Sequence, residues 1–148
     1  MLAAASLRRR MSERPRPGID GVSGFFGLRW DSHTTTRMEV RPELINAAGF
    51  LSGVSAYTMI DYTMGSTLWR ETEEDEGIAT LNISINYING VSGEGELICT
   101  CELDRRNRGS AVLRSEVRHS DGRLIATAVG SYVIFKRRDR PAQAGPQT

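Results

Sequence analysis

The chain has 148 residues, of which 39% are hydrophobic and 25% charged, and this is the composition of a single globular domain. Residues 1–17 carry a net charge of +4 and residues 136–148 a net charge of +3, so with +1 overall the body between them is acidic, at −6. An acidic body argues against nucleic-acid binding through the fold, and no apolar run approaches the roughly 18 residues of a membrane span.

The two basic ends are expected to lie outside the folded domain. Residues 1–17 begin with a short apolar patch followed by arginines, the reverse of a secretory signal. Two interpretations of this start remain open: an Arg-rich organelle-targeting leader, or an upstream extension in which Met11 is the true start. In both cases we expect a disordered extension over residues 1–17, one domain over residues 18–138 and a disordered tail over residues 139–148.

The domain is predicted to begin with a short helical turn followed by a strand. Residues 21–28, GVSGFFGL, are expected to form the turn and to place Phe25 and Phe26 in the core. Over residues 29–40, apolar and β-branched side chains alternate with polar ones, which predicts one half-buried strand. Pro42 ends it, because proline cannot donate a hydrogen bond to the sheet.

The next segment, residues 46–69, has the periodicity of one long helix. Its small and apolar residues recur every three or four positions and form one stripe: Gly53, Ala56, Tyr57, Ile60, Met64 and Leu68. Ser52 is the expected N-cap, since its hydroxyl oxygen suits the unpaired N–H groups of the first turn.

Asp61 is the single carboxylate of this helix and lies at the border of the apolar stripe, about 40° from Tyr57 around the axis. No Lys or Arg stands three or four residues away to pair with it. A partly buried carboxylate is a candidate acid, base or nucleophile. Two alternatives remain open: a carboxylate held by neighbouring hydroxyls in the core, or one that faces solvent on a rotated helix.

The rest of the chain is predicted to be strand. The acidic run over residues 71–76 is interpreted as a solvated turn. Four strand-like runs follow, bounded by Gly, Asn and Asp turn residues: 78–88, 94–103, 109–119 and 124–136. Short links predict that successive strands are antiparallel neighbours. One helix and a long sheet that curls around it make an α+β fold.

Two details of these strands bear on function. In the first run one face is polar, with Thr80 among asparagines and serines, and the other face is apolar and expected to pack toward the helix. The polar face is either the wall of a polar site or interface, or a solvent face. Cys99 and Cys101 share one face of the next run and are too few for a structural zinc site, so we interpret them as core residues of a protein in the reducing cytoplasm.

The combined motif spacing resembles that of the hotdog-fold acyl-CoA thioesterases of the phenylacetate-pathway type. That family carries Asn, two residues, Gly, two residues, His-Gly-Gly, six residues and Asp, then a Thr-rich strand, a Tyr and a late Asp-Gly-Arg turn. The matching residues here are Asn46, Gly49, Ser52-Gly53-Val54, Asp61, Thr80, Asn86-Tyr87 and Asp121-Gly122-Arg123. The resemblance covers roughly residues 20–136 and implies a hotdog fold, with a long antiparallel β-sheet wrapped around one central helix.

The resemblance also implies how the site works. In that family the backbone N–H of the Gly after the His polarises the thioester carbonyl, and the Asp attacks or orients a water; the matching residues are Gly53 and Asp61. The implied catalytic set is completed by Asn46, Ser52 and Thr80. Here Ser52 stands where the family has its His, and Val54 where it has its second Gly. The missing imidazole favours an alternative, a non-catalytic acyl-CoA-binding or interaction module on the same fold.

Substrate contacts are predicted at two places. The turn formed by Arg105, Arg106, Asn107 and Arg108 is the one basic cluster of the acidic body, and guanidinium groups suit the phosphates of coenzyme A. A solvated hairpin turn is the alternative there. Tyr57, Met64, Leu68 and Trp69 are expected to border an acyl pocket, unless that stripe is plain core. No metal and no separate cofactor is expected, because coenzyme A is part of the substrate.

The predicted activity is therefore hydrolysis of an acyl-CoA or acyl-carrier thioester by a homo-oligomer, a dimer or a dimer of dimers. At about 1.5 Å of rise per residue, the backbones of Gly53 and Asp61 lie about 12 Å apart on one helix. One thioester reaches both groups only if they come from two subunits, since attack requires contact at about 3–3.5 Å. A hotdog dehydratase is disfavoured, because His33 and His119 are the only histidines and neither lies on the helix.

Overall fold

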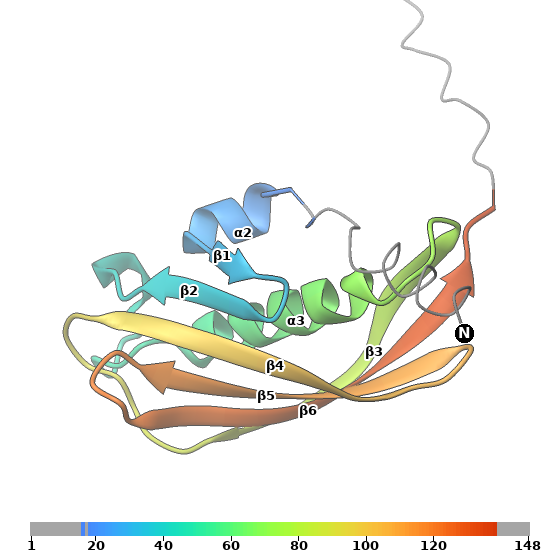
Figure 1. Cartoon of the computed structure of the whole chain (residues 1–148). Helices are drawn as coiled ribbons and strands as arrows, with labels where there is room; N and C mark the ends of the chain where they lie inside the picture. Colours follow the sequence, from blue (N-terminus) through green and yellow to red (C-terminus); the bar gives the residue numbers. More distant parts are fainter. Residues whose placement is uncertain (1–15, 17, 139–148) are drawn as a thin grey trace, which may run out of the picture.

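One long helix lies against the concave face of a curled antiparallel sheet (Figure 1), and the computed structural model describes residues 16 and 18–138. The helices are α2 (Gly21–Phe26) and α3 (Gly53–Arg70), with a 3-10 turn, η1, at Pro42–Leu44. The strands are β1 (Arg29–Ser32), β2 (Thr35–Glu39), β3 (Glu76–Tyr87), β4 (Glu96–Arg106), β5 (Ser110–His119) and β6 (Leu124–Lys136). The predicted α+β architecture is confirmed. The tail and, apart from residue 16, the N-terminal extension predicted to be disordered lie outside the described residues.

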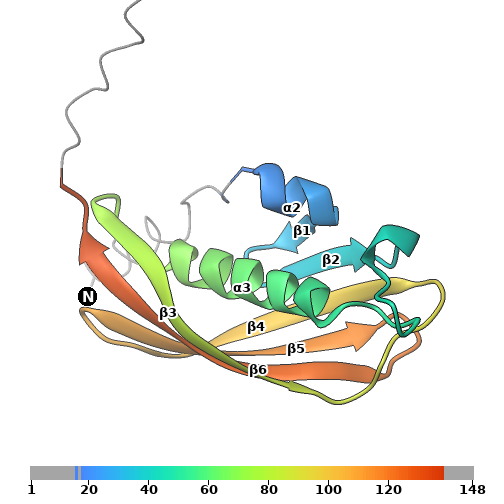
Figure 2. The ribbon, with the colours of Figure 1, turned by 180° about the vertical axis from the view of Figure 1, so that it is seen from behind.

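The strand order is β1-β2-β4-β5-β6-β3, so the prediction that successive strands are neighbours fails at one point. β3 pairs with β6 rather than with β4, and lies at the sheet edge opposite β1 (Figure 2). The turn after β3 is therefore not a hairpin: the N–H groups of Ile88 and Asn89 donate to the carbonyl of Ile125 at the start of β6. This leaves β3 as a 12-residue edge strand.

The single strand predicted over residues 29–40 is in fact the hairpin β1–β2. The chain reverses at residues 33–34, where the Thr34 N–H donates to Ser32 Oγ at 3.2 Å. The predicted short helix is confirmed as α2, but Phe25 is 63% exposed and only Phe26 packs against the core. Successive helical residues point about 100° apart, so two adjacent phenylalanines cannot both face inward.

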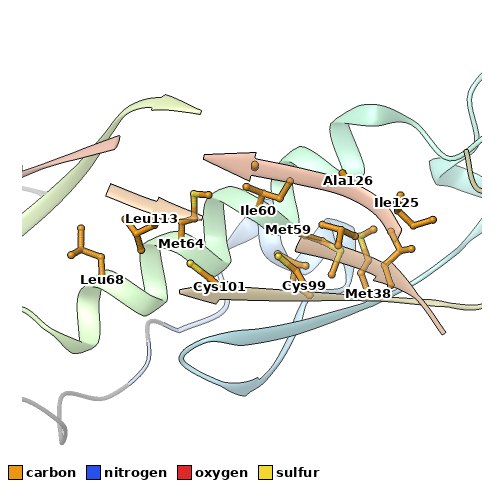
Figure 3. Packing of buried hydrophobic residues seen from close by; sticks show 14 of the residues in the cluster. Met38, Met59, Ile60, Met64, Leu68, Cys99, Cys101, Leu113, Ile125 and Ala126 are labelled. Carbon is orange, nitrogen blue, oxygen red and sulfur yellow. The ribbon is translucent and has the colours of Figure 1, made fainter. Parts of the chain in front are cut away.

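The core lies between α3 and the sheet (Figure 3), where Met59, Ile60, Met64 and Leu68 have no exposed surface. At Gly130 of β6 the helix approaches so closely that an added Cβ would lie 2.6 Å from Met64 Sδ. Buried hydroxyls widen the packed face of α3 beyond its apolar stripe, and each bonds to a carbonyl one turn back: Thr63 to Met59 at 2.6 Å and Thr67 to Thr63 at 2.7 Å.

Cys99 and Cys101 face this core as buried free thiols. Burial raises the pKa of Cys99 to about 12 and also raises the pKa of Cys101, so both remain protonated at neutral pH. Protonated buried thiols are unreactive, which agrees with their interpretation as small core residues.

A β-bulge in β3 decides which of its side chains face the helix. The register against β6 shifts between Thr80 and Asn82, so Leu81 is an extra residue in the strand. Before the bulge Thr80 bonds to α3, and after it Ile83, Ile85 and Tyr87 pack or bond on the same side. The predicted apolar inner face is therefore correct beyond the bulge, and Thr80, expected on the opposite face, points to the helix.

Candidate active site

Asp61 lies in the middle of α3 and is partly exposed. The Thr80 hydroxyl donates to Asp61 Oδ1 at 2.8 Å, and the Tyr132 hydroxyl donates to the same oxygen at 2.9 Å. The carboxylate is therefore held by hydroxyls, as one of the alternatives predicted, and it also lines a cleft.

This Asp61 cleft has a volume of about 440 Å³ and lies on the outer side of α3, between the two edges of the curled sheet. Its lining residues are Asp20, Trp30, Asp61, Tyr62, Gly65, Ser66, Trp69, Ile78, Ala79, Thr80 and Tyr132. The polar groups of two lining aromatics are internally paired: the Tyr62 hydroxyl donates to Asp20 Oδ2 at 2.7 Å, and Trp30 Nε1–H donates to Ser66 Oγ at 3.2 Å. Their rings are left to form apolar walls.

The carboxylate of Asp20 is also fixed in place. It caps α2 by accepting from the Ser23 N–H at 2.8 Å, and this bond, followed by that from Tyr62, lowers the pKa of Asp20. Burial, helped by the hydrogen bond to Asp20, raises the pKa of Tyr62 to about 12. At neutral pH the pair is therefore an ionised carboxylate and a neutral phenol.

A second cleft, of about 270 Å³, lies at the start of α3. It is lined by Leu51, Ser52, Gly53, Ala56, Tyr87, Ile88, Asn89, Gly90, Val91 and Ile125. Ser52 is confirmed as the N-cap and accepts from the Val54 N–H at 3.4 Å. Gly53 is the first residue of the helix, so its N–H has no intrahelical acceptor.

Gly53 lies in close contact with Tyr87, which leaves little room for a side chain. The Tyr87 hydroxyl donates to the Gly53 carbonyl at 2.8 Å, and a Cβ on Gly53 would lie 3.1 Å from the Tyr87 ring. The Gly53 cleft and the Asp61 cleft share no lining residue. Eight residues of helix, about 12 Å, separate Gly53 from Asp61, so the two clefts are separate within one chain.

Other predicted site residues lie away from both clefts. Asn46 orders the loop before α3, where its Oδ1 accepts from the N–H groups of Ala48 at 3.0 Å and Phe50 at 3.2 Å. Tyr57 is 42% exposed and lines neither cleft, whereas Met64 and Leu68 are fully buried. The pocket role expected of Met64 and Leu68 is therefore corrected: they are core residues. Trp69, by contrast, does line the Asp61 cleft.

The predicted phosphate-binding turn is partly occupied by other contacts. Arg106 pairs with Glu76 at 2.6 Å, and Glu76 is only 7% exposed. The prediction that the acidic run is solvated is therefore wrong at Glu76. Arg105 Nε donates to Asn107 Oδ1 at 3.0 Å, and Arg108 is exposed. None of the three arginines lines either cleft, and their turn lies at the end of the molecule opposite the start of α3 (Figure 1).

Sequence reasoning assigned no role to two residues that the structure brings to the clefts. The only signal for Tyr132 in the sequence was a polar aromatic residue at an inward position of the last strand, between Gly130 and Ile134. Arg123 belongs to the Asp-Gly-Arg turn, and its Nη1 donates to the carbonyl of Gly90 at the rim of the Gly53 cleft, at 3.1 Å.

Within residues 18–138 no group of three or more His, Cys, Asp or Glu side chains is placed to hold a metal ion. No helix in that range is long and apolar enough to cross a membrane.

Comparison with known proteins places these features in a family. Solved structures with the same fold include the following three. The conserved protein PA5202 of Pseudomonas aeruginosa is 27% identical, with a TM-score of 0.72 over 86% of this chain and 98% of that one. The BH2602 protein of Bacillus halodurans, solved with CoA, is 19% identical, with a TM-score of 0.74 over 90% and 83%. The PaaI protein of Escherichia coli, from the phenylacetic acid degradation operon, is 12% identical, with a TM-score of 0.72 over 80% and 86%.

No curated protein matches the chain. The model of the thioesterase superfamily, however, matches residues 48–126, more than half of the sequence. This range holds the whole of α3, with Gly53 and Asp61, and most of the sheet that wraps around it. The resemblance of the motifs is thus confirmed, and the chain belongs to the thioesterase superfamily, with the hotdog fold of its structural neighbours.

Proposed function

We propose that the protein hydrolyses an acyl-CoA or acyl-carrier thioester, with Asp61 as nucleophile or general base and the Gly53 N–H as oxyanion donor. The observation that carries the proposal is the Asp61 carboxylate, held by two hydroxyls in a cleft with apolar walls. Membership of the thioesterase superfamily supports a thioester as the substrate. The CoA in the BH2602 structure supports coenzyme A as the thiol part of that thioester.

The chemistry suits the two clefts. The first turn of an 18-residue helix presents unpaired N–H groups and the positive end of the helix dipole, which stabilise negative charge that develops on the carbonyl oxygen. Asp61 then attacks the carbonyl carbon or takes a proton from a water that does so. Attack by Asp61 breaks the C–S bond and leaves a mixed anhydride, which a water then hydrolyses to restore the Asp61 carboxylate; attack by water breaks the same bond directly. By either route the thiolate of coenzyme A takes up a proton and leaves as the thiol, and the acyl group ends as a carboxylate.

The shared site is proposed to form by pairing of β3 with β3 of a second subunit. Gly53 contacts Tyr87, the last residue of β3, and Asp61 contacts Thr80, in the first half of the strand. Counting the bulge as one position, Ser84 lies midway between Thr80 and Tyr87. Antiparallel pairing about a two-fold axis at Ser84 therefore brings each Tyr87 opposite Thr80 of the partner subunit, and each Gly53 toward the partner's Asp61.

Two features of the surface support this dimer. β3 is a 12-residue edge strand, and long unpaired edges tend to be covered. Exposed apolar side chains also gather around the start of α3 and the end of β3: Phe50, Val54, Tyr57, Tyr87 and Ile88. A second subunit on β3 would bury such a patch.

Replacing Ser84 with cysteine is expected to produce a disulfide-linked dimer under mild oxidation, visible on a non-reducing gel. Directly opposed residues in an antiparallel pair have Cα atoms about 4.5–5.5 Å apart, within the range of a disulfide. The native Cys99 and Cys101 are buried thiols and should not form cross-links.

The matched control is Asn86→Cys, which is also exposed on β3 but in this register lies opposite Asn82 of the partner subunit. A Ser84→Cys protein that remains monomeric, or equal cross-linking by Asn86→Cys, would rule out the register.

We propose that Arg123, at the rim of the Gly53 cleft, binds the phosphates of coenzyme A. Its Nε also bonds to Asp121 Oδ2 at 2.8 Å, which fixes the guanidinium group in place. Arg105 and Arg108 remain alternatives, on the turn at the opposite end of the molecule (Figure 1).

The Asp61 cleft also indicates the charge of the acyl group. It contains two carboxylates, Asp20 and Asp61, and none of the described residues that line it is cationic. A second carboxylate on the acyl chain would therefore be repelled, so we propose a neutral acyl group.

Asp20→Asn is accordingly expected to raise kcat/KM for succinyl-CoA relative to butyryl-CoA by about tenfold, the effect of removing a repulsion of about 1.4 kcal/mol. Asparagine keeps the side-chain oxygen that caps α2. Asp31→Asn, a β1 carboxylate outside the cleft, is the control and should leave the ratio unchanged. An unchanged ratio in Asp20→Asn would remove Asp20 from substrate selection.

A second candidate function is non-catalytic binding of an acyl-CoA. It is favoured by Ser52, which replaces the family's His and acts as a helix cap. A panel of acyl-CoAs, followed with a thiol-reactive reporter and by calorimetry, separates the two functions. Release of free thiol supports hydrolysis, binding without release supports the binding module, and the absence of both contradicts each proposal.

A further inference from the structure

We infer that Tyr132 is a positioning residue that, together with Thr80, holds Asp61 so that Oδ2 is its reactive oxygen. The inference rests on the proposed thioesterase function. It specifies which atom of the carboxylate attacks, and which buried side chain orients it.

Both hydroxyl donors converge on one carboxylate oxygen. Thr80 and Tyr132 donate to Asp61 Oδ1 at 2.8 and 2.9 Å, and the Tyr132 hydroxyl also lies 3.2 Å from the Asp61 carbonyl oxygen. Within the described part of the chain, no donor contacts Oδ2. An oxygen that accepts two hydrogen bonds has its lone pairs engaged, so Oδ2 keeps the electron pair available for a carbonyl carbon or for a proton of water.

The fold makes this arrangement rigid. Thr80 and Tyr132 are cross-strand partners at the bulge of β3, so the bulge itself places the two hydroxyls side by side beneath Asp61. Tyr132 is only 2% exposed and lies on β6, which is paired with a strand on each side. Burial and the negative charge of Asp61 raise the pKa of Tyr132, so its phenol remains a proton donor wherever the carboxylate is ionised.

The two hydrogen bonds also restrain a side chain that is otherwise free to turn. An Asp within a helix competes for nearby backbone groups, and a rotated carboxylate would point away from the substrate. With Oδ1 fixed, Oδ2 forms the bond to the acyl carbon as the thiolate leaves, or it accepts the proton of the attacking water. In both routes the same oxygen reacts.

The test is Tyr132→Phe, which removes only the hydroxyl. We expect kcat to fall about 10- to 100-fold with KM changed less than about twofold, as for loss of an oriented catalytic base. Thr80→Val removes the other donor to Oδ1 and should likewise lower kcat with little change in KM.

Thr36→Val is the matched control for deletion of a buried hydroxyl. Thr36 is fully buried and bonds to Thr63 at 2.7 Å, away from the Asp61 cleft. It should change thermal stability without moving kcat or KM. Tyr132→Phe with wild-type kcat, or with a loss of kcat/KM that lies mainly in KM, would overturn the inference even if the enzyme is active and depends on Asp61. Absence of activity in the wild type would instead contradict the proposed function.

Discussion

Replacing Asp61 with asparagine is expected to lower kcat/KM by at least about a thousandfold. An amide is neither a useful nucleophile nor a base at neutral pH, and loss of a positioned base alone costs about 10²–10⁴ in rate. The structure makes the variant informative, because the amide oxygen of asparagine still accepts from Thr80 and Tyr132. The fold should therefore survive, as a thermal melt would verify.

Asp104→Asn is the matched control for this loss. Asp104 is a carboxylate of β4 that pairs with Arg114 at 2.9 Å and lies outside the Asp61 cleft. Its variant should keep full activity in the same thiol-release assay. If Asp61→Asn hydrolyses acyl-CoA at a rate near that of wild type, Asp61 has no part in the chemistry.

Co-expression of Gly53→Pro with Asp61→Ala should recover about a quarter of wild-type activity, although each variant alone falls to about 1% or less. A mixed dimer joins the intact Gly53 of one subunit to the intact Asp61 of the other. Random pairing makes about half of the dimers mixed, with one working site in two. Activity is measured on the whole co-expressed dimer population, without separating the mixed dimers from their parents.

The structure supports the choice of proline and adds a control. Ser52 has φ −58° and ψ 135°, the extended conformation that a residue before proline prefers, and proline is tolerated in the first turn of a helix. Any side chain at Gly53 nonetheless presses on the Tyr87 ring. Gly53→Ala adds the same Cβ but keeps the N–H, so it separates crowding from loss of the oxyanion donor. Well-folded mixed dimers as inactive as their parents would disprove the shared site.

Local chemistry in the sequence was enough to predict most elements and to place two candidate site residues on one helix. The helical period and the cap at Ser52 predicted α3, and alternation with turn residues predicted all four strands that follow. The same motif spacing placed Gly53 and Asp61 on one helix, too far apart to act together. These features depend on residues within a few positions of one another, so they can be read along the chain.

Tertiary structure alone decided the contacts between distant segments. The identity of the strand beside β3 is not a local property of the sequence. The pairing of β3 with β6 brought Tyr132 to Asp61 from 71 residues away. One extra residue, Leu81, turned Thr80 toward the helix against the simple alternation. Glu76 is not solvated as the sequence predicted, because Arg106, on another strand, pairs with it. Such pairings depend on how the sheet curls and where its register shifts, and no periodicity in the sequence encodes either one.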